Sequence, residues 1–80
     1  MATLYNADGS VEENVDISSL RKQQNLVGGD VEYIYTSDKI FIVNEEGHFI
    51  HLPYNEEASS IYGHSLVGDV VICESNEINL

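Results

Sequence analysis

Basic side chains are scarce in this sequence. Three Lys and Arg residues stand against fourteen Asp and Glu, the formal net charge is −11, and the seven acids after Lys39 have no basic residue among them. Phosphate backbones and anionic membranes attract Lys and Arg, so direct binding to nucleic acid or to a membrane is not expected. A basic protein surface or a cation is a better partner, although acidic residues also serve simply to keep a small protein soluble.

Cysteine and long apolar runs are scarce as well. The single cysteine, Cys73, excludes a disulfide framework, and because it ends the apolar run 70–72 we expect it in the core rather than as a nucleophile. The N-terminus lacks the basic and apolar stretches of a signal peptide, and no run approaches the roughly 20 apolar residues of a membrane helix. The expected location is the cytoplasm.

Catalytic and metal-binding signatures are missing too. The sequence has no GxSxG, HExxH or Cys–His spacing, and Asp30 rather than a lysine follows the glycine pair 28–29, which disfavours a phosphate loop. His48 and His51 would face opposite sides of a predicted strand, and His64 lies in a predicted turn. We therefore expect no enzymatic activity, no cofactor and no metal site.

The residues that are present suit one small globular domain spanning 1–80. Hydrophobic residues make up 42% of the chain, which is enough for a core and argues against global disorder. Domains of this size often gain stability by association, so a homo-oligomer is one expectation.

Local patterns predict the fold class. Asp8 and Gly9 favour a hairpin turn, Asn55 is a helix N-cap residue, and Gly28 and Gly63 each follow a helical segment and are expected to end it. The predicted class is α+β, a small and mainly antiparallel sheet of about five to six strands with two short helices. The predicted order ββαβββαβ comprises a hairpin over 2–15, a helix over 20–27, strands over 30–36, 40–43 and 48–52, a helix over 56–62, a strand over 70–73 and an acidic tail over 74–80.

A second hairpin is predicted at the centre of the chain, over Lys39–Pro53. The apolar run 40–43 lacks alternation, so we expect a strand that is covered on both faces. The turn residues 44–47 would connect it to a returning strand over 48–52, which Pro53 would end.

Four short patterns occur in a fixed order along the chain. They are V-G-G-D-V-E at 27–32, N-E-E-G at 44–47, L-P-x-N at 52–55 and V-G-D-V-V at 67–71. Together they resemble a family of small proteins known only as a domain of unknown function, found mostly in bacteriophages and other viruses and in bacteria that carry their remnants. The resemblance covers a core of about residues 18–73. It implies a viral accessory protein acting in the host cytoplasm, and it transfers no catalytic residue.

Stoichiometric binding is the function that these observations favour. An acidic surface containing tyrosines would bind a host protein, possibly a basic one, and antagonise a host defence factor. The residues expected to supply charge are Glu45, Glu46, Glu56 and Glu57, and those expected to supply contact are Tyr33, Tyr35 and Tyr54.

The alternative hypothesis is an oligomeric sponge that sequesters a small signalling nucleotide used in antiviral defence. Backbone amides at Gly28, Gly29 and Gly68 would then hold the phosphates. The shortage of Lys and Arg counts against this alternative.

Overall fold

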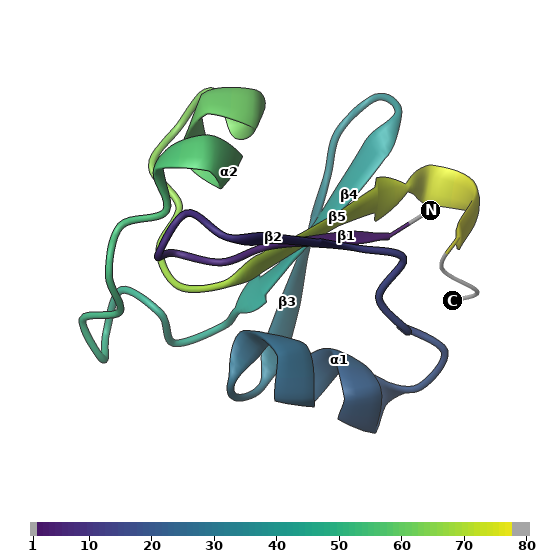
Figure 1. Ribbon diagram of the computed structural model, residues 1–80, viewed down its shortest axis with the longest axis horizontal. Helices are drawn as coiled ribbons and strands as arrows, with labels where there is room; N and C mark the ends of the chain where they lie inside the picture. Colours follow the sequence, from purple (N-terminus) through teal and green to yellow (C-terminus); the bar gives the residue numbers. More distant parts are fainter. Residues whose placement is uncertain (1, 78–80) are drawn as a thin grey trace.

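Five strands form one antiparallel sheet in the computed structural model, which describes residues 2–77. The strands are β1 (Thr3–Tyr5), β2 (Val11–Glu13), β3 (Val31–Tyr35), β4 (Lys39–Asn44) and β5 (Val70–Glu74), in the order β2-β1-β5-β4-β3. The helices α1 (Leu20–Val27) and α2 (Glu56–Tyr62) lie on opposite sides of the sheet (Figure 1). The predicted α+β class, with an antiparallel sheet and two short helices, is confirmed.

Alternating side chains of β4 and β5 build a core on each face of the sheet. Ile40, Ile42 and Cys73 belong to the buried cluster that α1 covers, and Phe41 and Val43 belong to the cluster that α2 covers. A strand buried on both faces needs a continuous apolar run, so the interpretation of residues 40–43 is confirmed. The expected core position of the cysteine is confirmed as well, since its side chain is buried.

Both helices begin and end where their sequences predict. Ser19 caps α1 by accepting a hydrogen bond from the Lys22 amide (Oγ–N distance 3.2 Å), and Gly28 ends the helix in the left-handed conformation. Asn55 caps α2, and Gly63 ends that helix with a φ of 94°. Glycine adopts this conformation without the steric cost of a Cβ atom.

The ends of the chain also follow the predicted pattern in part. The N-terminal hairpin predicted over 2–15 is present, because β1 and β2 pair antiparallel. The tail predicted over 74–80 begins inside β5, continues as a short 3-10 helix (η1, Ser75–Glu77), and otherwise lies outside the described residues. Within the described chain, no helix has the length and apolarity to cross a bilayer.

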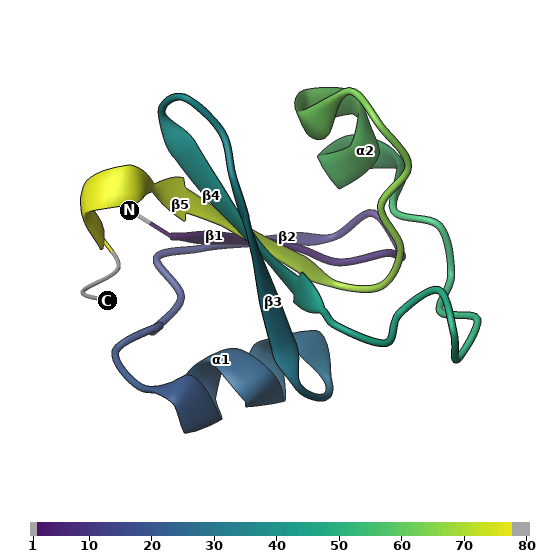
Figure 2. The same cartoon turned by 180° about the vertical axis from the view of Figure 1, so that it is seen from behind.

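The strand predicted over 48–52 is wrong. Strand β4 already pairs with β3 along one edge and β5 along the other, so it offers no free edge to a returning strand (Figure 2). The segment folds into tight turns instead. The Ile50 amide donates to the Glu46 carbonyl (2.9 Å) and the Leu52 amide donates to the Gly47 carbonyl (3.0 Å).

The side chain of Asn55 joins three parts of the fold. Its Nδ2 atom donates to the carbonyl oxygens of Tyr5 and Gly68, both at 2.8 Å, and its Oδ1 atom accepts from the Ala58 amide at 3.0 Å. The residue is fully buried. One asparagine thereby connects the end of β1, the turn before β5 and the start of α2.

Asn44 plays a similar part at the end of β4. Its Nδ2 atom donates to the Val27 carbonyl at the end of α1 (3.3 Å), and its Oδ1 atom accepts from the Glu46 amide (2.8 Å). A Cβ atom on Gly29 would lie 2.9 Å from Asn44 Nδ2, too close for real contacts. The asparagines and glycines of the sequence patterns therefore have structural roles.

Replacing Asn55 with alanine should strongly destabilise the protein. Asn55→Ala leaves the Ala58 amide and two carbonyls without their side-chain partner, and we expect the free energy of unfolding to fall by about 2–4 kcal/mol. Urea unfolding followed by circular dichroism measures this loss. The matched control is Asn25→Ala on the exposed surface of α1, which should stay within about 0.5 kcal/mol of the parent. Equal stability of the two variants would contradict the prediction.

Candidate functional site

The β4–α2 loop, residues 45–55, and the helix turn after it hold most of the predicted binding residues. Glu45 and Glu46 are exposed where the loop begins, and Tyr54 is 56% exposed near its end. Glu56 and Glu57 are exposed in the first turn of α2. The structure thus places these five side chains along one continuous segment.

The other two predicted contact residues lie elsewhere. Tyr33 is partly buried beside α1, and its hydroxyl donates to Gln23 Oε1, whose Nε2 donates to the Ile17 carbonyl (2.9 Å). Burial raises the pKa of the Tyr33 phenol, which therefore remains a protonated donor. Tyr35 is 57% exposed but pairs with Ile40 near the start of β4, at the end of that strand opposite the loop. The predicted acidic and aromatic surface is therefore divided.

The three glycine amides of the sponge hypothesis already have partners inside the protein. The amides of Gly28 and Gly29 both donate to the Gln24 carbonyl, at 2.8 and 3.1 Å. The amide of Gly68 donates to the Pro53 carbonyl at 2.7 Å. A phosphate group would have to displace these bonds before it could use the donors.

Hollows beside the loop have acidic linings. One, of about 430 Å³, lies between the β1–β2 turn and the start of α2 and is lined in part by Asp8, Glu56 and Glu57. Hydrogen bonds from the hydroxyl and amide of Ser10 hold the pKa of Asp8 below its usual range, so this carboxylate is charged at neutral pH. A smaller hollow of about 190 Å³ includes Glu45. Such linings attract cationic groups and repel phosphates.

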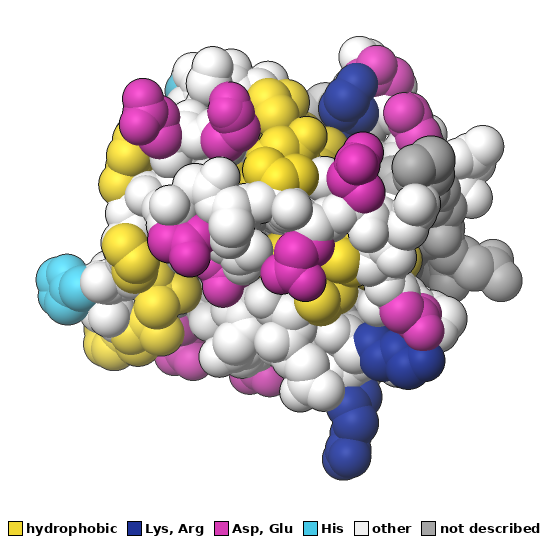
Figure 3. All heavy atoms as spheres, viewed as in Figure 1, with side chains coloured by type: hydrophobic (Ala, Val, Ile, Leu, Met, Phe, Trp, Pro, Cys, Tyr) yellow, Lys and Arg dark blue, Asp and Glu magenta, His cyan; other side chains and the backbone are white. Residues whose placement is uncertain are grey.

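The fold separates the basic side chains from the β4–α2 loop. Lys39 begins β4, whereas the loop follows that strand's last residue, Asn44. Arg21 and Lys22 lie in the first turn of α1, and it is the last residue of that helix, Val27, that reaches Asn44. On the face shown in Figure 3, Lys and Arg side chains lie on the right, whereas Figure 1 shows the loop on the left of the same view.

Two of the basic side chains form ion pairs with acids outside the loop. The Lys22 Nζ atom lies 2.6 Å from an oxygen of Asp16, and the Lys39 Nζ atom lies 3.4 Å from an oxygen of Asp38. The hydrogen bond from Lys22 holds the pKa of Asp16 well below its usual range. These pairs are exposed and add little stability, and they place acids beside the basic side chains.

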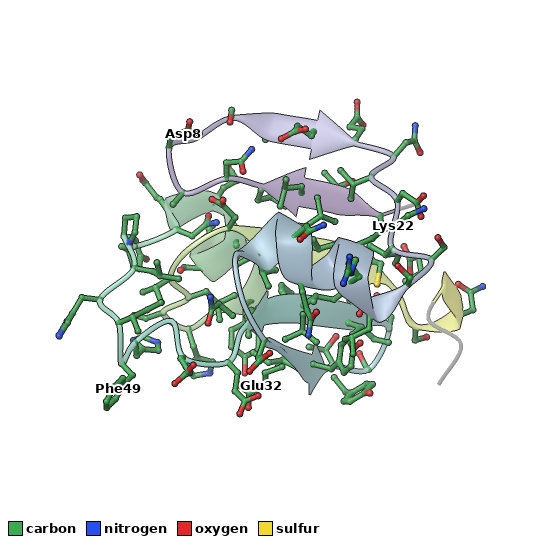
Figure 4. All side chains as sticks on the ribbon, turned by 90° about the horizontal axis from the view of Figure 1, so that it is seen from below. Asp8, Lys22, Glu32 and Phe49 are labelled. Atoms are coloured by element: carbon green, nitrogen blue, oxygen red, sulfur yellow. The ribbon has the colours of Figure 1, made fainter. Side chains whose placement is uncertain are left out.

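Two apolar residues of the loop were not predicted as surface residues. Phe49 is 82% exposed and Ile50 is 50% exposed, although both lie in the segment predicted as a strand. Figure 4 shows Phe49 pointing away from the fold, on the side of the molecule opposite Lys22. No local sequence signal distinguishes this exposed apolar pair from a strand, because the difference arises from the two neighbours that β4 has elsewhere in the chain.

The histidines do not assemble into a metal site. His48 and His51 lie in the β4–α2 loop rather than on a strand, and the ring of His64 packs against Tyr62 with 5.5 Å between centroids. Among residues 2–77, no three His, Cys, Asp or Glu side chains gather closely enough to hold a metal ion. His48 and His51 are exposed and flank Phe49 and Ile50 in the loop.

Comparison with known proteins gives a family and no further relative. A family model described as Domain of unknown function (DUF3846) matches residues 2–79, nearly the whole chain. Neither the search of curated proteins nor the search of solved structures found a match.

Neutralising the two glutamates that begin the loop should stabilise the protein at low salt. Glu45→Gln with Glu46→Gln reduces repulsion in a region distant from the basic side chains, so we expect the melting temperature at low ionic strength to rise by roughly 2–4 °C. The gain should disappear in about 0.5 M salt, where charges are screened. Asp16→Asn is the control, because this acid has a cationic partner and its neutralisation should give no gain. A gain that persists at high salt would show that repulsion is not the cause.

Proposed function

Because the chain belongs to the DUF3846 family, a domain of unknown function, we propose its role from its surface: it binds a host protein stoichiometrically and does not act as a catalyst. In this proposal it is a small acidic accessory protein of viral origin that works in the host cytoplasm and antagonises a defence factor. The viral origin rests on the resemblance carried by the four sequence patterns. The asparagines and glycines of those patterns have structural roles, so the binding surface is sought in exposed side chains, including Glu45, Glu46 and Tyr54 within the patterns.

The observation that carries the proposal is an acidic segment that lies apart from Lys and Arg. Glu45, Glu46, Glu56 and Glu57 lie along one segment, and the fold directs Lys and Arg elsewhere. A surface of one sign accelerates encounter with a partner of the opposite sign and discourages partners of the same sign. The favoured partner is a basic protein surface, such as one that otherwise binds nucleic acid, with these carboxylates in place of phosphates.

Tyr54 is the tyrosine best placed for contact. It is exposed, lies between the two glutamate pairs in the sequence, and lines a hollow of about 370 Å³ together with Glu56. Tyrosine presents a large apolar ring and a polar tip, and it is enriched among residues that dominate binding energy. Tyr33 has a structural role in the α1 contact, and Tyr35 is distant from the glutamates.

Nucleotide sequestration is less well supported by the geometry. The glycine amides that would hold phosphates have internal partners, and the hollows beside the loop carry carboxylates. Mass spectrometry of small molecules released from protein purified out of infected cells separates the two proposals. Recovery of a stoichiometric nucleotide would favour sequestration over protein binding.

Retention of the host partner should depend on where negative charge is removed. The test variant changes Glu45, Glu46, Glu56 and Glu57 to Gln, and the control changes Glu12, Glu13, Asp16 and Asp38 to the matching amides. Both lose four negative charges, so they have the same net charge. We expect the test variant to retain at least tenfold less partner from host lysate, and the control to resemble the parent.

Salt provides the second measurement in the same experiment. Partner retained by the parent should fall steeply between low salt and about 0.5 M salt, because exposed charges are screened. Equal retention by both variants, or a partner held equally well at high salt, would contradict charge-driven binding.

A further inference from the structure

We propose that Phe49 and Ile50 form an apolar contact point that inserts into an apolar pocket bordered by Lys and Arg on the partner protein. This inference rests on the proposed function and specifies the chemistry of its partner. Phe49 is the most exposed of the large hydrophobic side chains in residues 2–77, with 82% of its surface open, and Ile50 beside it is half exposed. Large aromatic side chains at the centre of an interface supply much of the binding energy.

The loop presents this pair in a fixed shape. The Gly47 amide donates to the Asn44 carbonyl (3.1 Å), and further backbone bonds from the amides of Ile50 and Leu52 close the turns that follow. The Asn44 side chain accepts from the Glu46 amide in the same region. A contact residue held in one conformation before binding loses less conformational entropy when the partner arrives.

His51 and Leu52 return the loop to the body of the protein after Phe49 and Ile50. Leu52 lies against the Gly68 turn, where a Cβ on that glycine would come within 2.7 Å of Leu52 Cδ1, so the return of the loop is closely packed. His51 has a φ of 58°, a left-handed conformation that is uncommon for residues other than glycine. Between the anchored ends, Phe49 and Ile50 have no neighbouring core to enter.

Phe49 and Ile50 are called the loop tip below. Charge determines which kind of molecule the loop tip can contact. Glu45 and Glu46 precede the apolar pair in the same loop, and Glu32 lines a hollow with Glu45 and His48. A second copy of this chain, with a net charge of −11, would be repelled, and an anionic membrane would be repelled likewise. A protein pocket with an apolar floor and a basic border complements both features of the loop.

A photo-reactive side chain at the tip identifies what it touches. Phe49 is replaced by p-benzoylphenylalanine, host lysate is the probe, and peptides cross-linked on illumination are sequenced. The control places the same group at Val11, which is 48% exposed on β2. We expect position 49, and not position 11, to capture one partner at a surface containing apolar residues beside Lys or Arg.

Binding to the captured and purified partner then measures the contribution of the tip. Phe49→Ser should raise Kd by roughly 30-fold or more while the slope of affinity against salt stays unchanged, because no charge is removed. Val11→Ser should leave Kd within threefold. Thermal unfolding shows whether each variant is folded, and Phe49→Ser should melt like the parent because Phe49 is already 82% exposed.

The possible failures are distinguishable. If Phe49→Ser leaves Kd unchanged while binding stays sensitive to salt and to the four glutamates, the apolar contact is wrong and charge-driven binding stands. If Phe49→Ser abolishes binding that salt does not affect, the apolar contact stands and the charge proposal is wrong. Cross-links from position 49 to a second copy, with a dimer mass that Phe49→Ser abolishes, would overturn the inference in favour of self-association. Absence of any cross-linked protein, while a partner is still retained in the salt-dependent pull-down, would overturn the apolar contact and leave the charge proposal standing.

Discussion

The hydrogen bonds of the Asn55 side chain are the constraint on which the arrangement of this fold most depends. They connect the end of β1, the turn before β5 and the start of α2, three segments that are distant in sequence. An amide is suited to this position because it supplies two donors and an acceptor without a net charge, whereas a carboxylate would face two carbonyl oxygens. Asn44 makes the corresponding connection between β4, α1 and the loop. Buried polar groups with complete hydrogen bonding specify one arrangement of the chain, so residues that resemble a functional signature can serve the fold alone.

Local chemistry in the sequence predicted much of this fold, and non-local pairing accounts for what it did not predict. The caps at Asn55, Gly28 and Gly63 are decided within a few residues, and each was predicted correctly. The segment 48–52 has the composition of a strand, but its structure depends on whether β4 has a free edge, and β3 and β5 occupy both edges. The residues of the candidate site also differ in whether local sequence decides their positions. The glutamates adjacent in sequence stay adjacent in space, whereas the environment of Tyr33 depends on the contact between β3 and α1, which no local pattern shows.

The separation of Lys and Arg from the β4–α2 loop arises from the direction in which α1 and β4 run. The basic residues lie in the first half of the sequence, near the start of α1 and the start of β4. Both elements then run toward Asn44, where α1 ends and the β4–α2 loop begins. Antiparallel pairing and short connections therefore convert an uneven distribution of Lys and Arg along the sequence into a loop end that lacks them. Asp16 and Asp38 pair with Lys22 and Lys39 at the other end, so acids also accompany the basic side chains there.

Acidity and the exposed apolar tip have linked physical consequences. An exposed phenylalanine next to an isoleucine is a liability for a soluble protein, because identical tips on different copies attract one another. Repulsion between highly acidic chains opposes that approach within the range of the Debye length, which is about 8 Å at physiological salt. The same charge attracts a basic surface, so it opposes self-association and favours the proposed partner at once. A tip with equal apolarity on a neutral protein would lack this discrimination, which is why the charge and the apolar pair are best understood as one recognition surface.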